Sequence, residues 1–283
     1  MSKQIFMPLL SMLLLALFGC DFSTDQYPAP NDYDLNHPVT VMLQTELNEI
    51  SGIVYYPKDT SVFAISDETG WLYKIFPTRQ VKVQKWKFGK NHDYEDLQLV
   101  DSIFYILSST GDIVTIKFLP NDSMDVQQYK FPKEHKNEFE TLYFDKATGL
   151  LNIICKNCKN EKKHRVSVWT FNPSTHEYNL SSLFIDVAAL AKEFDKKKME
   201  LKPSAAAINP LTNELFILSS VNKLLVIADK NGSVKSAYPL NPGTYKQPEG
   251  IAFTPSGDLL ISNESANEGS ANILVIKYKK KHQ

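Results

Sequence analysis

Three glutamates occupy the same place in a phrase that recurs along the sequence. They are Glu95 (Glu-Asp-Leu-Gln-Leu), Glu140 (Glu-Thr-Leu-Tyr-Phe) and Glu249 (Glu-Gly-Ile-Ala-Phe), whereas the phrase opens with Ser51 and Ser204 at its two other occurrences. Carboxylates that converge in a small space repel one another unless they are solvated, protonated, paired with lysine or arginine, or bound to a cation. Their oxygen atoms are hard ligands that suit Ca²⁺ or Mg²⁺ better than a thiophilic metal. The three glutamates are therefore candidate cation ligands, and Ca²⁺ is the cofactor that this chemistry favours.

Further oxygen ligands stand at the ends of two apolar runs. Asp67 follows the run 62–66, and Asn263 ends the run 259–263. Two alternatives to a metal site stay open: a water-filled acidic channel without a specific ion, or glutamates that accept hydrogen bonds from backbone N–H groups of neighbouring repeats. The predicted metal-binding set comprises Glu95, Glu140, Glu249, Asp67 and Asn263, with Glu49, Glu68 and Glu264 close to them in the sequence.

Catalytic motifs give little support for an enzyme. The sequence has no Gly-x-Ser-x-Gly elbow, no Gly-rich phosphate loop and no His-Glu-x-x-His motif. His92, in Asn-His-Asp-Tyr-Glu-Asp, precedes Glu95 closely enough to act as a base or a ligand, although a loop histidine at this position is also compatible with no function. We assign no catalytic residue from the sequence.

The spacing of the phrase predicts the fold that positions these residues. Its starts at positions 51, 95, 140, 204 and 249 are separated by 44, 45, 64 and 45 residues. Four β-strands with their turns fill about 40 to 50 residues, which is the size of one propeller blade. The sequence therefore predicts an all-β protein with a single β-propeller of five blades, each of four antiparallel strands. Six blades stay possible if one degenerate repeat has escaped detection.

Each repeat continues with strands of decreasing hydrophobicity. Near-continuous apolar runs such as 104–108 and 215–219 are typical of strands buried between neighbouring sheets, whereas alternating segments such as 81–86 suit an exposed edge. The last repeat lacks a fourth strand, and 38–44 resembles the missing piece, so we expect the N-terminal strand to close the ring. The long interval before Ser204 predicts one inserted helix over 186–200, either a lid over the channel or a decorated loop.

The N-terminus is typical of an exported lipoprotein. Lys3 precedes the apolar stretch 9–18, and Leu-Phe-Gly-Cys20 resembles the lipobox of bacterial lipoproteins, in which the cysteine carries the lipid. This stretch is too short to span a hydrocarbon layer of about 30 Å. The expected organisation is a signal peptide over 1–19, an acylated tether over 20–37 and the propeller domain over 38–283. The protein would then be anchored in the bacterial cell envelope, with the inner or outer membrane left undetermined.

Charge and cysteine content restrict the partners. Lysine and arginine number 31 against 32 aspartates and glutamates, so no net positive field attracts nucleic acid. The lipidated Cys20 would bind the membrane, and we expect a further partner, either an unidentified small ligand or an envelope protein. We expect the protein to be a monomer. Cys155 and Cys158 form Cys-Lys-Asn-Cys, and outside the cytoplasm a local disulfide is favoured over zinc or redox chemistry.

Several of these segments together resemble a known family. The chain resembles the SdiA-regulated family of bacterial propellers over about residues 45–277. The segments that carry the resemblance are 49–55, 63–73, 93–97 and 247–253. The resemblance implies an envelope-associated propeller without a firmly defined reaction, for which calcium responses and phytase-like activity have been suggested. It also implies that Asp67, Glu68, Glu95, Asp96 and Glu249 are the motif acids. The fourth repeat departs from the family phrase, because Pro-Ser204-Ala replaces an acid followed by glycine.

Two functions fit these observations. The first is a lipid-anchored envelope propeller that binds a ligand, an ion or a partner, with an acidic channel that holds Ca²⁺. The alternative is a metal-dependent hydrolase of phosphoesters (phytase-like) or lactones that uses the same channel. A third interpretation is an assembly scaffold that uses the rim of the propeller.

Overall fold

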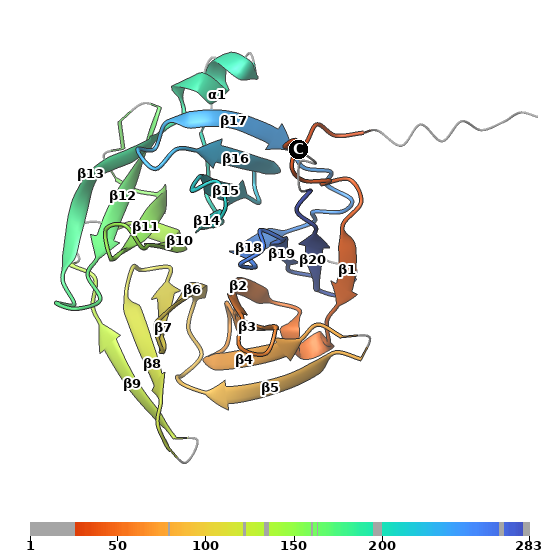
Figure 1. The fold of residues 1–283 in the computed structure, drawn as a ribbon. Coiled ribbons are helices and arrows are strands. Elements are labelled where there is room, and N and C mark those ends of the chain that lie inside the picture. Colours follow the sequence, from red (N-terminus) through yellow and green to blue (C-terminus); the bar gives the residue numbers. More distant parts are fainter. Residues whose placement is uncertain are drawn as a thin grey trace, which may run out of the picture.

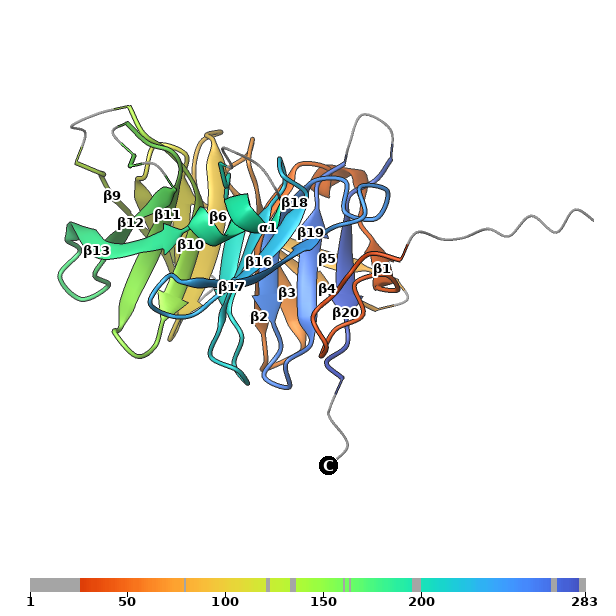
Figure 2. The same cartoon turned by 90° about the horizontal axis from the view of Figure 1, so that it is seen from above.

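Five four-stranded antiparallel sheets are arranged around a common centre (Figure 1). The computed structural model describes residues 26–279, except 79, 121–122, 133–135, 160, 163, 195–199 and 266–268. In the perpendicular view the sheets stand next to one another around the ring (Figure 2). The predicted all-β propeller is confirmed, and it has five blades rather than six. The predicted signal peptide and Cys20 lie outside the described residues.

The innermost strand of each blade begins within two residues of the recurring phrase. Each of these strands contacts the innermost strands of both neighbouring blades, so that they surround the hub. The phrase therefore marks the part of each blade that lies closest to the axis. In blades 1 to 5 these strands are β2 (Ile50–Tyr56), β6 (Tyr94–Val100), β10 (Glu138–Asp145), β14 (Ala205–Ile208) and β18 (Pro248–Phe253).

The second strand of each blade is almost wholly buried. These strands carry the apolar runs of the sequence, because both faces of each strand pack against apolar side chains of neighbouring sheets. Phe63 of blade 1 and Phe104 of blade 2 illustrate this packing, with ring centroids 4.6 Å apart. The second strands are β3 (Ser61–Ser66), β7 (Ile103–Ser108), β11 (Leu150–Asn157), β15 (Leu215–Ser219) and β19 (Leu259–Asn263).

The outermost strand of each blade is its most exposed strand. The third strands are β4 (Trp71–Phe76), β8 (Ile113–Phe118), β12 (Arg165–Phe171), β16 (Leu224–Ala228) and β20 (Asn272–Ile276). The outermost strands are β5 (Lys82–Lys87), β9 (Met124–Tyr129), β13 (Tyr178–Asp186), β17 (Val234–Pro239) and β1 (Val39–Met42). Lysine and glutamine on β5 and β9 keep these edges solvated, which discourages pairing with another sheet.

The N-terminal strand closes the ring, as predicted. β1 pairs antiparallel with β20, with Val39 opposite Val275, and thereby becomes the fourth strand of blade 5. The segment before β1 also packs on the propeller. Tyr33 is buried between blades 4 and 5, and its hydroxyl donates a 2.7 Å hydrogen bond to the Gly257 carbonyl and accepts one from Asn209. The chain is therefore fixed to the propeller well before the first strand of the ring.

The inserted helix is shorter than predicted and does not cover the centre. The expected helix over 186–200 is wrong at its start, because Asp186 ends β13 and its carboxylate accepts a 3.0 Å hydrogen bond from the Ala188 N–H. Helix α1 (Ala188–Glu193) lies at the rim, outside β17 (Figure 1). A 3₁₀ turn, η1 (Thr45–Leu47), precedes β2. In the part of the chain that the structure describes, no helix combines the length and apolar character needed to cross a membrane.

Candidate functional site

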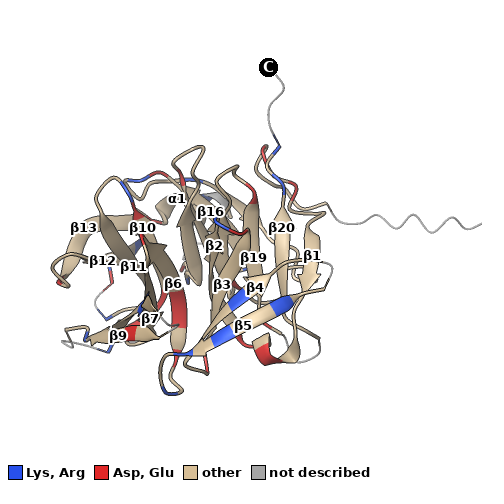
Figure 3. Cartoon of the chain, turned by 60° about the horizontal axis from the view of Figure 1, so that its bottom comes forward, with Lys and Arg blue, Asp and Glu red and all other residues tan. Residues whose placement is uncertain are grey.

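β-Bulges occur at the start of four innermost strands and determine where the acids lie. The pairing register skips Glu95 in β6, Glu140 in β10 and Glu249 in β18, and it breaks in the same way at Ser51-Gly52 in β2. A bulged residue is left out of the ladder, and the extra residue re-aims its side chain. The three glutamates, called the hub glutamates below, therefore project from bulges on the innermost strands (Figure 3 shows acidic segments on β6 and β10).

Two glycines of the recurring phrase permit close approach of neighbouring blades. A Cβ atom on Gly250 would lie 2.6 Å from the Ser51 carbonyl oxygen, and one on Gly52 would lie 2.6 Å from the Asp96 Cα. Such separations leave no room for a side chain. Glycine after serine or glutamate is thus required by the contact between innermost strands, independently of any ligand.

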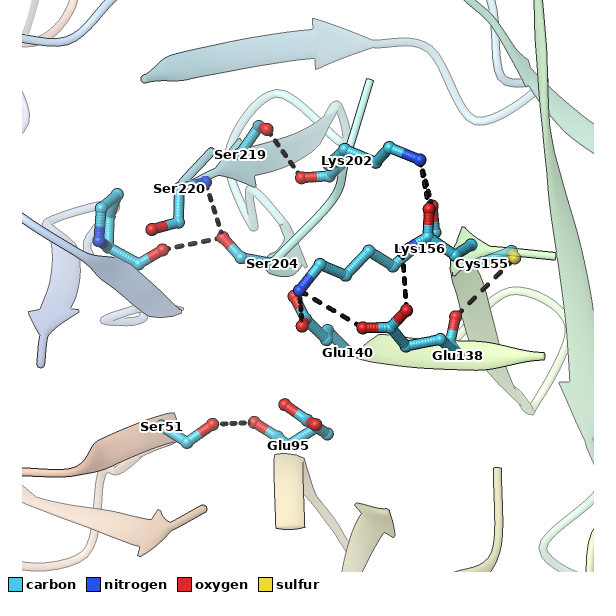
Figure 4. Close-up of polar contacts among 12 residues, drawn as sticks. Ser51, Glu95, Glu138, Glu140, Cys155, Lys156, Lys202, Ser204, Ser219 and Ser220 are labelled. Atoms are coloured by element: carbon cyan, nitrogen blue, oxygen red, sulfur yellow. Dashed lines mark hydrogen bonds and ion pairs between the residues drawn. The ribbon is translucent and has the colours of Figure 1, made fainter. Parts of the chain in front are cut away.

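Three of the polar residues in the phrase join successive blades. Ser51 Oγ donates to the Glu95 carbonyl (Figure 4), and Ser204 Oγ donates to the Pro248 carbonyl at 2.7 Å. The Asp96 carboxylate, 2% exposed, accepts 2.8 Å hydrogen bonds from the N–H groups of Leu97 and Leu142. Burial raises the pKa of Asp96 well above its usual value, although these hydrogen bonds lower it. Asp96 and the two serines therefore hold the ring together rather than face a ligand.

Lys156 is a cation that forms an ion pair with one of the hub glutamates, Glu140. Its ammonium forms an ion pair with Glu140 and lies 3.7 Å from a carboxylate oxygen of Glu138 (Figure 4). Burial lowers the pKa of Lys156, but the hydrogen bond and attraction of Glu140 outweigh this effect and raise it. The charge of Glu140 is therefore compensated from within the protein.

The pKa values of the hub glutamates reflect this crowding. Burial, followed by repulsion from Glu140, raises the pKa of Glu95 to about 10. Burial raises the pKa of Glu140 to about 7, against the opposing hydrogen bond from Lys156. Burial also raises the pKa of Glu249, while a hydrogen bond with Ser220 lowers it. Near neutral pH, Glu95 and Glu140 therefore hold protons more tightly than solvent-exposed glutamates do.

A second acidic cluster lies where blades 5 and 1 meet. One carboxylate oxygen from each of Glu49, Asp67 and Glu264 lies within 4.8 Å of the others. Glu49 precedes β2, Asp67 follows β3 and Glu264 follows β19, so ring closure brings together residues from opposite ends of the chain. We call these three residues the acidic group.

The acidic group lacks the compensation that Lys156 gives to the hub glutamates. Burial and then repulsion from Glu49 raise the pKa of Asp67 to about 6. Burial, followed by a hydrogen bond and repulsion involving Glu49, raises the pKa of Glu264 to about 8. The charged neighbours that contribute most to both shifts are carboxylates. Asp67 Oδ1 is also buried without a hydrogen-bond partner among the described residues.

The five residues predicted as metal ligands thus lie in three settings. Asp67 belongs to the acidic group, and Glu95, Glu140 and Glu249 lie at the hub near Lys156. Asn263 is fully buried, and its amide nitrogen donates to the Thr244 carbonyl (3.2 Å) and to Asn272 Oδ1 (3.0 Å). Within the described residues the hub glutamates do not form a compact three-ligand group of the kind that Asp67 joins. The metal-ligand role of the five stays a prediction.

His92 and the two cysteines, which the sequence also singled out, lie outside both acidic clusters. His92 is exposed, and its Nδ1 accepts a 2.7 Å hydrogen bond from the Asp93 N–H. Cys155 and Cys158 form a disulfide, with Cα atoms 5.9 Å apart. Glu161 lies close to their sulfur atoms, but paired cysteines are not thiolate ligands. The disulfide closes a small ring around Lys156 and Asn157.

A model of the SdiA-regulated family matches residues 29–267. The chain belongs to the SdiA-regulated family. No protein with a curated description matches it by sequence.

Solved structures similar to this SdiA-regulated propeller share its fold at low identity. Glutaminyl cyclase from Myxococcus xanthus is 13% identical with a TM-score of 0.56, covering 86% of this chain and 96% of that one. A luciferin-regenerating enzyme is 11% identical with a TM-score of 0.51, covering 85% and 95%. The calcium-binding protein regucalcin from Agrobacterium tumefaciens is 12% identical with a TM-score of 0.50, covering 88% and 95%. These likenesses establish the propeller fold alone.

Sequence reasoning did not identify Lys156 as the partner of the hub glutamates. The available signal was its place directly after the apolar run 150–155, on the strand that pairs with the one carrying Glu138 and Glu140. Glu49 and Glu264 were noted only as neighbours of other candidates, because their proximity depends on how the last blade of the SdiA-regulated fold meets the first.

Proposed function

We propose that this SdiA-regulated propeller is a binding protein that holds a divalent cation at its acidic group. The observation that carries the proposal is the convergence of three carboxylates within 4.8 Å at a place where the strongest charged neighbours are also acids. Converging carboxylates with raised pKa values gain free energy when a cation replaces the shared protons. The unpartnered Oδ1 of Asp67 supplies a buried oxygen that lacks another role.

Ca²⁺ is the cation that fits this group best. Ca²⁺ accepts oxygen ligands at about 2.3–2.6 Å, so two of its ligands can lie up to about 5 Å apart, which matches the observed spacing. Ca²⁺ also tolerates irregular ligand geometry, whereas Mg²⁺ requires a near-octahedral site. Regucalcin, whose description is that of a calcium-binding protein, shares the propeller fold.

Calorimetric titration of the purified protein with CaCl₂ tests the cation site. We expect binding to the wild type with an affinity in the millimolar to micromolar range, and a loss of at least about tenfold in Asp67→Asn. Glu177→Gln removes one exposed acid on the β12–β13 turn and is the matched control, with unchanged affinity. Absence of Ca²⁺ binding to the wild type, or equal binding by Asp67→Asn, would refute the proposal.

We further propose that the protein acts in the cell envelope of a bacterium, anchored by lipid on Cys20. The supporting observation is the sequence of residues 1–20, in which a short apolar stretch precedes Gly-Cys. Acyl chains of this kind bind membranes through burial of their methylene groups. Membrane fractionation tests this, because Cys20→Ala is expected to release the protein from the membrane fraction, and retention of the variant would contradict the anchor.

A hydrolase is the second candidate function, and Glu140 is the observation that favours it. A carboxyl group with a pKa of about 7 is suited to proton transfer near neutral pH. Phosphatase and lactonase assays with and without Ca²⁺ separate the two functions. Turnover by the wild type that is lost in Glu140→Gln would replace the binding proposal with an enzymatic one.

A further inference from the structure

A cleft of about 620 Å³ opens between blades 3 and 4, beside the hub. Its walls come from the end of β11, the β11–β12 loop, the start of β12 and the segment that leads into β14. This volume lies within the range of small-molecule sites, about 300–1,000 Å³. The described cationic side chains that line it are Lys136, Lys156, Lys159, Lys162, Arg165 and Lys202.

The positive charge of this basic cleft is only partly compensated. Its described lining includes two acids, Glu161 and Glu200, against six cationic side chains, one of which, Lys156, is already paired with Glu140 at the hub, so that a formal excess of three positive charges remains. Glu161 already accepts a 2.7 Å hydrogen bond from the Ser167 N–H. Lys136, Lys159 and Lys162 form no ion pair within the part of the chain that the structure describes, and all three are exposed. Such unpaired cations attract a multiply charged anion.

Several lining residues are held in place by the fold, which distinguishes the basic cleft from a set of mobile surface lysines. The Arg165 guanidinium lies over the Phe184 ring, 3.9 Å from its centroid. Lys202 Nζ donates to the Lys156 carbonyl at 3.3 Å (Figure 4). It also donates to the Asn157 side chain. Lys156 and Asn157 are themselves enclosed by the Cys155–Cys158 disulfide. This wall is therefore fixed before a ligand arrives, which lowers the entropic cost of binding.

His164 adds a polar atom to the same wall. It lines the cleft, and its Nδ1 is buried without a hydrogen-bond partner among the described residues. Its backbone has a positive φ of 61°, which holds the β11–β12 loop in an uncommon conformation. A buried unpartnered nitrogen costs free energy unless a ligand or water satisfies it. An anion that accepts a hydrogen bond from the imidazole N–H would do so.

We propose that the basic cleft binds a small ligand that carries two or more phosphate groups. Phosphate oxygens accept hydrogen bonds from lysine ammonium groups and, in a bidentate manner, from a fixed guanidinium such as that of Arg165. A single carboxylate would leave most of the excess charge uncompensated. The phosphates belong either to a soluble molecule or to a lipid headgroup, which the experiment distinguishes. The proposal does not depend on the cation site, since none of the three acidic-group residues lines the cleft.

Titration calorimetry with inorganic diphosphate, at low and at high NaCl, tests the proposal directly. We expect binding by the wild type that weakens as salt rises, because screening acts on exposed charges. The variant Lys159→Gln/Lys162→Gln changes two exposed side chains and is expected to bind about tenfold more weakly. The control Lys82→Gln/Lys117→Gln removes the same charge from β5 and β8, outside the cleft, and is expected to bind like the wild type.

Co-sedimentation with phosphatidylcholine vesicles, with or without cardiolipin, whose headgroup carries two phosphates, identifies the source of the phosphate. Binding of diphosphate alone that is lost in Lys159→Gln/Lys162→Gln supports a soluble ligand. Binding of cardiolipin vesicles that is lost in the same variant supports a lipid headgroup. The proposal is overturned if neither probe binds, or if the cleft variant binds both as well as the control does. Unchanged Ca²⁺ titration of the cleft variant keeps this outcome separate from that of the cation site.

Discussion

The acidic group and the basic cleft lie on the same face of the ring but carry opposite charge. Both are built where innermost strands begin and second strands end, yet one has three carboxylates within 4.8 Å and the other has six lining cations. The strands at the two places are alike, whereas the loops are not. At blades 5 and 1 the loops contribute Asp67 and Glu264, and at blades 3 and 4 the β11–β12 loop contributes Lys159 and Lys162. The repeated strands therefore form the scaffold, and the loops supply the side chains that determine the charge of each site.

Lys156 connects the basic cleft with the hub, which lies next to the acidic group. It lines the basic cleft and, at the same time, pairs with Glu140 at the hub, and Glu249 in turn raises the pKa of Glu264. A charge placed in the cleft therefore changes the electrostatic potential at the hub, because Lys156 lies at both places. The following predictions test whether the two regions act separately or as one electrostatic unit.

The largest expected effect is that of pH on the acidic group. Asp67 and Glu264 have pKa values raised to about 6 and about 8, so bound protons compete with Ca²⁺ between pH 6 and 8. Since about one proton is displaced per ion over this range, affinity should rise by up to about a hundredfold from pH 6 to pH 8. Calorimetry at the two pH values measures this rise. An affinity that is the same at both would show that these carboxyls are not the ligands.

The same pKa values fix the sign of the stability change in the absence of metal. Because the folded protein holds these protons more tightly than the unfolded chain, the folded state binds more protons between about pH 4 and pH 8. The contribution of Asp67 and Glu264 to stability therefore decreases as pH rises through this window. Added Ca²⁺ should oppose that decrease, and thermal unfolding at pH 8 with and without CaCl₂ measures the difference.

The second prediction removes the cation that connects the basic cleft with the hub. Lys156→Met leaves Glu140 near other acids without its cation, and Lys156 is 20% exposed in its side chain. We expect a loss of about 2 kcal/mol in the free energy of unfolding at pH 8, less than for a fully buried pair because Glu140 can become protonated. Urea unfolding measures this loss.

A double variant serves as the control for this experiment. Lys156→Met/Glu140→Gln removes both charges, so most of the stability should return. Equal losses in the single and double variants would mean that Lys156 contributes through packing rather than through charge.

Much of the architecture could be predicted from the sequence because each repeat encodes its own blade. The phrase beginning at Glu95 or Glu249 opens an innermost strand, and 38–44 was identifiable as the missing strand because the last repeat stops early. The helix over 186–200 was predicted too long, because β13 extends to Asp186, whose carboxylate accepts a hydrogen bond from the Ala188 N–H at the start of the shorter helix. Local periodicity does not reveal where a preceding strand ends.

The arrangement of the acids could be predicted only in part. The recurrence of Glu95, Glu140 and Glu249 indicated that they converge, but bulges and the ion pair to Lys156 decide what each of them faces. Glu49 and Glu264 are neighbours only because the last blade meets the first, and no short-range pattern encodes that contact. The basic cleft was not predicted, since four of its six cations, Lys136, Lys159, Lys162 and Lys202, come from loops rather than from the recurring phrase.

The smallest effect is expected from reduction of the Cys155–Cys158 disulfide. The bond encloses Lys156 and Asn157, and Asn157 in turn accepts a hydrogen bond from Lys202, so reduction loosens one wall of the basic cleft without removing a charge. Diphosphate binding should weaken by about threefold, while Ca²⁺ binding at the distant acidic group stays the same. Calorimetry with both ions on Cys155→Ser/Cys158→Ser, in parallel with the reduced wild type, measures the two effects. Equal changes in both affinities would mean that the hub transmits the loosening from one region to the other, and the two sites would then have to be treated as one.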